Sequence, residues 1–257
     1  MTESSNSYIF GRNSVIEAIR SESEIEKIFI CFGTEGDNIA RIYTMAKKAG
    51  IPAVSYDKRK FAQLEREICP SDTRSQGVIA LLRSFKIYSL RELIEIAYES
   101  TKEPLLVVLD EISDPHNLGA IARSAECAKV SGIILTERNS APISPTAIKV
   151  SAGALEHIPI AKVSSLAQAL AVLKDQGFWT TGTDMQASQL YTANIWDRPM
   201  ALIIGSEGKG IRPSVAKQCD MLIRIPMYGR IDSLNASVST GIILFEALRQ
   251  KTDNFKI

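Results

Sequence analysis

Short apolar runs alternate with amphipathic helical stretches along most of the chain, and this alternation predicts an α/β fold. In the first 83 residues, helical spacing over 14–19, 39–48 and 61–67 alternates with strand-like runs, namely KIFICF, PAVSY and GVIALL. Gly50 follows the second helical stretch, where glycine commonly ends a helix. Residues 1–83 are therefore predicted to form a small α/β domain.

A change of pattern follows this first domain. Residues 90–98 have the spacing of one amphipathic helix, and the TKEP turn then ends at Pro104, which marks a change of element. We predict a linker over residues 84–103. From Leu105 onward, helical stretches separate short buried runs, namely LLVVL, GIIL, FWTTGT, ALIIG and MLIRIP. Continuous apolar runs of this kind indicate a doubly wound parallel sheet over residues 104–257.

Composition excludes several classes of protein and leaves a globular one. The chain has 257 residues, of which 45% are apolar, enough for a sizeable core. No apolar run approaches the roughly 20 residues that span a bilayer, and the first residues lack the features of a signal peptide. We therefore expect no membrane partner and a cytoplasmic location.

Charge gives no general attraction to nucleic acid. Thirty Lys and Arg residues face 29 Asp and Glu residues, so any RNA binding must use local patches. The pair Lys47 and Lys48 and the run Lys58, Arg59, Lys60 are candidates. Such clusters are more often solvated helix faces than binding sites.

The cysteines and histidines argue against metal and nucleophile chemistry. The four cysteines are far apart without a CxxC pair, and His116 and His157 are the only histidines. These spacings suggest neither a disulfide framework nor a zinc site. We expect no metal.

Polar and glycine-rich segments follow three of the predicted strands. The first is EISDPHNLGAIARSAE, in which Asn117 and Gly119 open a helix and Arg123 lies one to two turns inside it. A capped helix with a solvated arginine would look the same. Ligand sites in open α/β sheets nevertheless lie at the carboxyl ends of the strands, where this segment begins.

The other two segments strengthen that interpretation. LIIGSEGKGI delivers Gly205 and Glu207 into a tight loop, which is neither a Walker A motif nor a clear GxGxxG. IPMYGRIDSLNASVSTG passes from an apolar run into Ser233 and Asn235 just before a helix, so these two residues are also good helix caps. Three such segments in one domain predict one nucleotide-like pocket.

The segments NLGAIAR, IIGSEGKGI and IPMYGRIDSLNASVSTGIILFEA match, in order and spacing, the three motifs of the SpoU (TrmH-like) family of the SPOUT superfamily. The chain thus resembles RNA ribose 2'-O-methyltransferases, strongly over residues 102–257. The segments GRNSVIEAI and SQGVIALL are similar to the substrate-binding domain of RlmB-type members, which methylate a guanosine of large-subunit (23S) ribosomal RNA. Transfer RNA methylation within the same family and a non-catalytic RNA-binding ribosome-assembly factor remain the alternatives. A Rossmann dehydrogenase is disfavoured, because GxGxxG does not follow the first strand of this domain.

The resemblance implies a fold, a cofactor and a set of site residues. It implies a homodimeric SPOUT domain with a parallel sheet and a deep trefoil knot that binds S-adenosylmethionine, and an N-terminal domain like ribosomal protein L30. The implied cofactor contacts are Thr183, Gly205, Ile225 and Leu234. The implied catalytic positions are Arg123, Asn117, Glu207, Ser233 and Asn235.

The implied role of Arg123 needs a chemical adjustment. The family places this arginine at the ribose hydroxyl that receives the methyl group. A guanidinium is effectively always charged in proteins, so it is a poor general base. We therefore predict that Arg123 activates the hydroxyl electrostatically, by stabilising the developing alkoxide or holding a nearby phosphate.

Overall fold

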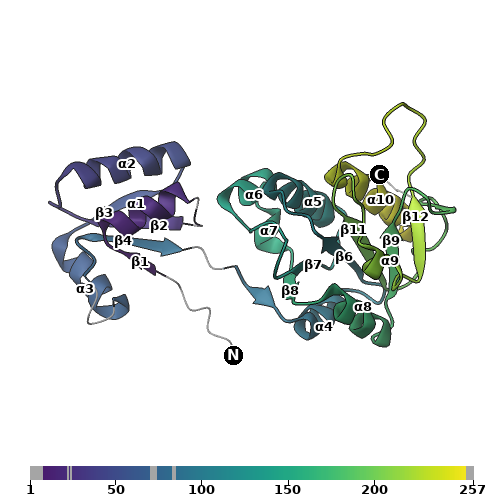
Figure 1. Ribbon diagram of the computed structural model, residues 1–257. Coiled ribbons are helices and arrows are strands. Elements are labelled where there is room, and N and C mark those ends of the chain that lie inside the picture. Colours follow the sequence, from purple (N-terminus) through teal and green to yellow (C-terminus); the bar gives the residue numbers. More distant parts are fainter. Residues whose placement is uncertain (1–7, 22, 24, 70–73, 83–84, 253–257) are drawn as a thin grey trace. The chain divides into compact units, whose positions relative to one another are not determined.

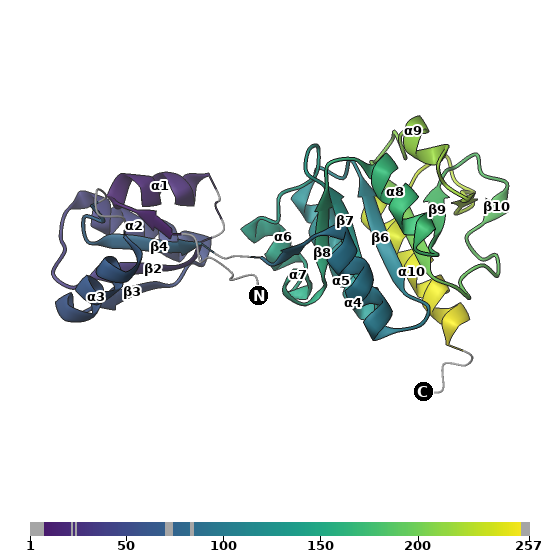
Figure 2. The same cartoon turned by 90° about the horizontal axis from the view of Figure 1, so that it is seen from below.

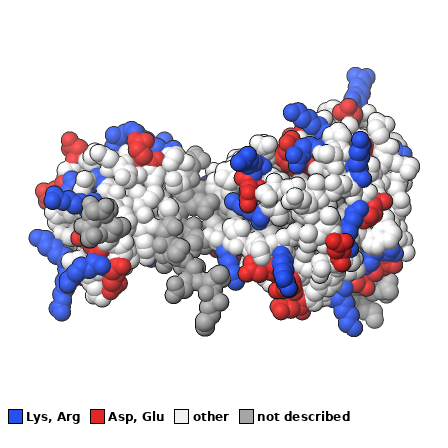
Figure 3. Space-filling model, turned by 60° about the horizontal axis from the view of Figure 1, so that its bottom comes forward, with Lys and Arg blue, Asp and Glu red and all other residues white. Residues whose placement is uncertain are grey.

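The computed structural model describes residues 8–21, 23, 25–69, 74–82 and 85–252. The chain divides into two compact units, Met1–Phe85 and Lys86–Ile257, each with its own sheet. The division lies two residues beyond the predicted end of the first domain. Lys and Arg side chains project from both units with Asp and Glu among them (Figure 3), in keeping with the nearly balanced charge of the sequence.

The smaller unit is a four-stranded sheet with helices on both faces (Figure 1). The strand order is β1 (Tyr8–Phe10), β4 (Val78–Leu82), β2 (Ile25–Cys31) and β3 (Ala53–Tyr56). β2 and β3 are parallel, and β4 runs antiparallel to β1 and β2. The helices are α1 (Arg12–Arg20), α2 (Asp37–Ala49) and α3 (Lys58–Ile68).

Alternation along β2 supplies two separate apolar layers in this unit. Ile28 and Ile30 pack in a cluster with α1 and α2, whereas Phe29 packs with Phe61 of α3 on the other face. Successive strand residues point to opposite faces, so one strand can serve both layers. Gly50 ends α2 in the left-handed conformation, as its position in the sequence predicts.

The larger unit contains an eight-stranded sheet whose neighbouring strands are all parallel. The order is β10 (Gln189–Leu190), β12 (Met221–Arg224), β9 (Trp179–Thr183), β11 (Met200–Gly205), β6 (Leu105–Asp110), β7 (Gly132–Thr136), β8 (Ile160–Val163) and β5 (Ile87–Tyr88). β6, β7 and β11 are buried along their whole lengths. This pattern confirms the predicted α/β class with a parallel sheet.

Helices cover both faces of this sheet (Figures 1 and 2). α4 (Leu90–Ser100), α8 (Leu166–Asp175) and α9 (Pro213–Ala216) share an apolar core with β6 and β11. On the opposite face, α5 (Pro115–Cys127) packs against three helices, namely α6 (Pro145–Val150), α7 (Ala154–His157) and α10 (Ala236–Lys251).

The predicted linker over residues 84–103 is corrected by the structure. Residues 87–88 pair with β8 as strand β5, and α4 buries Leu93, Ile94 and Ala97 in the core of the larger unit. Ser89 begins α4 with a capping box, because its hydroxyl accepts from the Glu92 N–H and the Glu92 carboxylate accepts from the Ser89 N–H. The segment is therefore an integral layer of the larger unit.

Candidate active site

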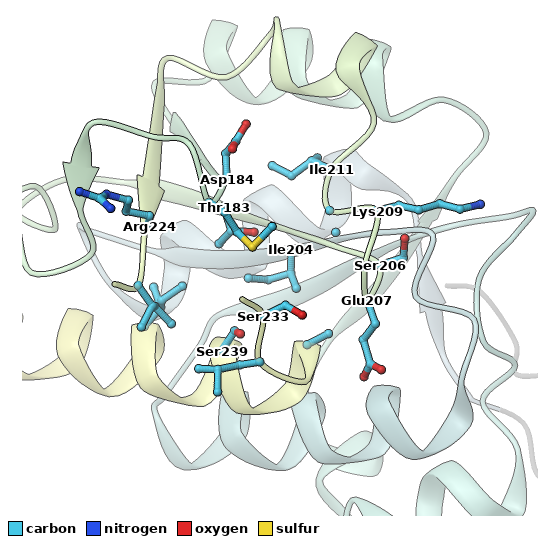
Figure 4. Close-up of a pocket in the computed structure, with 18 of the residues that line it drawn as sticks. Thr183, Asp184, Ile204, Ser206, Glu207, Lys209, Ile211, Arg224, Ser233 and Ser239 are labelled. Carbon is cyan, nitrogen blue, oxygen red and sulfur yellow. The ribbon is translucent and has the colours of Figure 1, made fainter. Parts of the chain in front are cut away.

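A pocket lies at the carboxyl ends of β9, β11 and β12, in the larger unit (Figure 4). It encloses about 890 Å³ of empty space, part of which is open to solvent. Cofactor pockets of roughly 300–1,000 Å³ are usual. Its walls come from residues 183–185, 204–211, 223–227 and 233–243. These stretches include the glycine-rich segment and the polar segment that the sequence analysis singled out.

The glycine-rich loop after β11 closes tightly upon itself. The Gly210 N–H donates to the Ser206 carbonyl at 2.9 Å. A Cβ at Gly205 would lie 2.0 Å from the carbonyl carbon of Gly210, so residue 205 has no room for a side chain. In Figure 4, the side chains of Lys209 and Arg224 point away from the pocket on opposite sides. The pocket wall is therefore formed largely by backbone.

A buried ion pair attaches this loop to the neighbouring strand. Asp110 ends β6 opposite Gly205 and is fully buried. Its carboxylate accepts from the Arg212 backbone N–H at 2.8 Å and from the Arg212 Nε at 2.7 Å, and the Arg212 Nη2 lies 2.7 Å from Oδ1. Charge-assisted bonds of this geometry are among the stronger ones in proteins. They hold the end of the loop, just before α9.

Asn235 joins three distant segments at the edge of the pocket. Its Oδ1 accepts from the backbone N–H groups of Ser237 and Val238, so it caps α10. Its Nδ2 donates to the Asn117 Oδ1 at 2.9 Å and also to the Glu207 carboxylate. Asn117 in turn donates to the same Glu207 oxygen at 2.9 Å. The structure thus brings together three predicted catalytic positions that are far apart in the sequence.

The other two predicted catalytic positions are placed differently. Ser233 lines the pocket. Arg123 is exposed on α5, six residues after Asn117, and lies outside the pocket lining. Within the described part of the chain, neither side chain has a hydrogen bond or ion pair. Both are therefore free to contact a ligand, and Arg123 is not assembled with the network in a single copy of the chain.

All four predicted cofactor positions line the pocket. Thr183 lies at the end of β9, Gly205 at the end of β11, Ile225 just after β12, and Leu234 before α10. The sequence analysis did not identify Asp184, Met185 or Met227, which also line it. Asp184 follows a strand end directly, and that position is the signal that could have found it.

Other chemistries find little support in the described residues. No group of three or more His, Cys, Asp or Glu side chains in them could hold a metal ion. Burial raises the pKa of the Cys219 thiol to about 11, which leaves it protonated and unreactive near neutral pH. In the same part of the chain, no helix combines the length and apolar character needed to cross a bilayer.

Comparison with known proteins gives a consistent family. The profile described as the SpoU rRNA Methylase family matches residues 104–245, and the profile described as RNA 2'-O ribose methyltransferase substrate binding matches residues 8–88. The chain is 36% identical over 244 residues to the putative TrmH family tRNA/rRNA methyltransferase YacO of Bacillus subtilis, covering 95% of this chain and 96% of that protein.

Two solved structures extend the similarity to the fold. The AdoMet-bound rRNA methyltransferase from Sinorhizobium meliloti is 25% identical with a TM-score of 0.61, covering 98% of this chain and 90% of that one. The SpoU methyltransferase AviRb from Streptomyces viridochromogenes, in complex with AdoMet, has a TM-score of 0.63 at 21% identity, covering 96% and 90%. Both similarities span the two units.

Proposed function

Because the chain belongs to the SpoU rRNA methylase family, we propose that it transfers a methyl group from S-adenosylmethionine to the 2'-hydroxyl of a ribose in RNA. The target we propose is a guanosine of 23S ribosomal RNA. S-adenosylmethionine supplies an electrophilic methyl group on a sulfonium sulfur. A C–O bond forms as the C–S bond breaks, and S-adenosylhomocysteine and a proton are released.

The observation that carries this proposal is the placement of the polar network beside the pocket. Glu207 belongs to both: it lines the pocket and accepts hydrogen bonds from Asn117 and Asn235. A ligand held by the backbone of the three loops would therefore lie next to fixed polar groups. Displacement at a methyl group needs a close, aligned nucleophile, and such groups can orient a ribose hydroxyl.

The lining fits the proposed cofactor. Ile204, Ile223 and Ile243 offer apolar contacts for an adenine ring, and the carboxylate of Asp184 offers an acceptor. The glycine loop leaves its backbone groups accessible because Gly205, Gly208 and Gly210 have no side chains. We propose that Thr183, Gly205, Ile225 and Leu234 contact the cofactor mainly through backbone groups. The implied trefoil knot would involve these C-terminal loops, and it forms part of the same proposal.

Arg123 is proposed as the electrostatic activator of the hydroxyl. It is exposed and without a polar partner in the part of the chain that the structure describes, so its charge is available to a substrate. Approach of RNA to the α5 face would place phosphate or developing alkoxide charge near this guanidinium. Ser233 and Asn117 are proposed to orient the ribose.

We also propose a homodimer formed through the larger unit. Val238 and Phe245 of α10 are 48% and 45% exposed, although both are apolar. They are seven residues apart, and half-buried Ile242 lies between them, so they form one stripe along the helix. An exposed apolar stripe of this kind favours a protein partner. A second copy of the chain is the partner that this family implies.

Two measurements test the proposed function. Isothermal titration should detect S-adenosylmethionine with an affinity on the order of micromolar and no binding of NAD. Tritiated methyl transfer to purified ribosomal RNA and to transfer RNA would then identify the substrate, and mapping 2'-O-methyl positions in RNA from a deletion strain would identify the nucleotide. Transfer to tRNA alone would contradict the ribosomal assignment. Cofactor binding without transfer to either RNA would indicate a non-catalytic RNA-binding protein.

A further inference from the structure

A large aromatic side chain is exposed at one end of the smaller unit. Phe32 is 68% exposed, more than any other large apolar side chain among the described residues of that unit. It follows directly after β2, which ends at Cys31. Leaving a phenylalanine in water forgoes roughly 1.5–3 kcal/mol of possible burial energy. This cost calls for an explanation, which the surroundings of Phe32 supply.

The loop that presents Phe32 is firmly held in place. The Phe32 N–H donates to the Tyr56 carbonyl at 2.7 Å, and the Thr34 N–H donates to the Cys31 carbonyl at 3.1 Å. The Arg12 Nη1 donates to the Glu35 carbonyl at 3.2 Å. Phe32 is therefore exposed on an ordered turn, not on a loose segment.

The two N-terminal sequence motifs supply much of this support. Arg12 belongs to GRNSVIEAI, and its Nε also donates to the carbonyl of Gln76, which belongs to SQGVIALL. A Cβ at Gly77 would lie 2.6 Å from the Thr34 hydroxyl, so the second motif packs closely against the turn. Both motifs thus serve to position the turn that carries Phe32.

Three cations lie beside this turn. β3 runs parallel to β2, with Tyr56 opposite Cys31, so Phe32 and the run Lys58, Arg59, Lys60 leave the same edge of the sheet. The Lys58 Cε is within 3.9 Å of the position that a Cβ at Gly33 would take. The Lys60 Nζ lies 4.2 Å from the centre of the Tyr56 ring. We call Phe32, Lys58, Arg59 and Lys60 the basic-aromatic patch.

The position of these cations is unfavourable for the helix itself. They occupy the first turn of α3, which contains no acidic residue, and the helix dipole disfavours positive charge there. Asp57 accepts from the N–H groups of Arg59 and Lys60, so the helix end is already capped. These hydrogen bonds to the Arg59 and Lys60 N–H groups hold the pKa of the Asp57 carboxyl below its usual value. Residues that violate a local preference are often retained for function.

A second aromatic and basic group on the same unit provides a contrast. Tyr43, Lys47 and Lys48 are exposed on α2, where the lysines occupy the last turn and complement the helix dipole. This group therefore satisfies the preferences of an ordinary solvated helix. It has the same chemistry as the basic-aromatic patch without the structural cost.

We propose that the basic-aromatic patch binds a single-stranded segment of the RNA substrate, with an unpaired base stacked on Phe32 and backbone phosphates at Lys58, Arg59 and Lys60. The proposal rests on the proposed function, because RNA is the substrate there. Stacking on an exposed aromatic ring beside cations is the usual way in which proteins hold single strands. The proposal adds to the family match the surface that makes the contact.

The test uses the full-length protein and a fluorescein-labelled RNA hairpin with a single-stranded loop, measured by fluorescence anisotropy. We expect F32A to weaken binding by about tenfold, the typical effect of losing one stacked base. The double variant Lys58→Ala with Lys60→Ala should weaken binding and lower the salt dependence by roughly one unit of slope. F32W should bind like the unaltered protein, because tryptophan also stacks.

The α2 group provides matched controls. Y43A and the double variant Lys47→Ala with Lys48→Ala remove the same chemistry from another surface and should leave hairpin binding unchanged. Equal losses in the patch and control variants would overturn the proposal, and so would unchanged binding in the patch variants. The fully paired duplex of the same length should be far less sensitive to F32A, and equal sensitivity would overturn the single-strand assignment.

Failure of this proposal can be distinguished from failure of the proposed function. Titration with S-adenosylmethionine and methyl transfer to ribosomal RNA are measured on the same variants. Normal hairpin binding and normal transfer by F32A would overturn the patch and leave the methyltransferase proposal intact. Specific loss of hairpin binding in a protein that transfers no methyl group would support the patch and contradict the methyltransferase proposal.

Discussion

Asn235 combines two roles because its two side-chain atoms face different partners. Its oxygen caps α10, and its nitrogen donates to Asn117 and Glu207. Serine caps helices as well as asparagine does but has no amide nitrogen. We predict that N235S keeps the thermal stability of the protein and loses about tenfold to a hundredfold in kcat/KM for methyl transfer, as expected when a charged acceptor loses its donor.

N235A serves as the comparison for this prediction. It removes both roles, so it should lose the same activity and, in addition, about 1 kcal/mol of stability through the missing cap. S233A should lower activity at unchanged stability, since Ser233 lines the pocket and makes no hydrogen bond to the described residues. Unaltered methyl transfer by N235S and S233A would reduce both residues to parts of a helix start.

Arg123 permits a second test at the residue scale. It is exposed on α5 and has no polar partner in the described parts of the chain, so R123K should change the free energy of unfolding by less than about 0.5 kcal/mol. Lysine keeps the charge and loses the planar fork of donors. We predict at least a tenfold loss of kcat in tritiated methyl transfer, because alkoxide or phosphate would no longer be held by two parallel bonds.

R91K provides the control for that measurement. Arg91 is an exposed arginine on α4 whose ion pair with Glu95 lies at the surface, so its replacement should change neither stability nor turnover. Near-normal turnover by R123K would contradict the electrostatic role assigned to Arg123, since neither the fork geometry nor an arginine-specific base would then be needed.

Individual site residues could be predicted from the sequence, but their contacts could not. Asn117, Glu207 and Asn235 each follow a predicted strand, and motif resemblance selected them. Their mutual hydrogen bonds span up to 118 residues of sequence, and local spacing holds no information on such contacts. Asp110 and Arg212 were missed as partners for the same reason, because 102 residues separate them.

At the scale of elements, the pair of Asp110 and Arg212 connects β6 to the loop after β11. Removing the arginine would leave a fully buried carboxylate without its countercharge. We predict that R212A lowers the free energy of unfolding by about 2 kcal/mol or more, the arginine being partly exposed, and weakens S-adenosylmethionine binding by releasing the glycine loop. Denaturant unfolding and isothermal titration measure the two effects.

The ion pair between Lys174 and Asp220 offers a matched control. Its Nζ and Oδ1 atoms are 2.8 Å apart, but both side chains are about one third exposed. K174A should therefore cost less than about 1 kcal/mol and leave cofactor affinity unchanged. An R212A protein that binds the cofactor normally would show that the pair stabilises the fold without positioning the loop.

Long, strongly patterned elements could be predicted from the sequence, and short edge elements could not. β6, β7 and β11 are continuous buried runs, and α2 has a regular apolar face that ends at Gly50. β8 has four residues, one of them exposed, and β5 has only two. Runs this short give no periodicity, and their pairing across the sheet depends on tertiary contacts.

At the scale of the whole molecule, the two-part organisation follows from two separate cores. Each unit buries its own apolar layers, and the change near Pro104 predicted a boundary in roughly the right region. The order of strands in the larger sheet was beyond sequence reasoning. β11 lies between β9 and β6, although almost 90 residues separate it from β6 along the chain, and only long-range packing determines this arrangement.

The apolar stripe on α10 tests the proposed homodimer. A charge at Phe245 would have to be buried if a second copy covers this helix, and an unpaired buried charge strongly opposes association. We predict that F245E shifts the protein from dimer to monomer in analytical ultracentrifugation and lowers methyl transfer. V172E, on the 42% exposed Val172 of α8, should remain dimeric and active. A dimeric F245E protein would place the interface elsewhere on the molecule, and a monomeric unaltered protein would exclude the homodimer altogether.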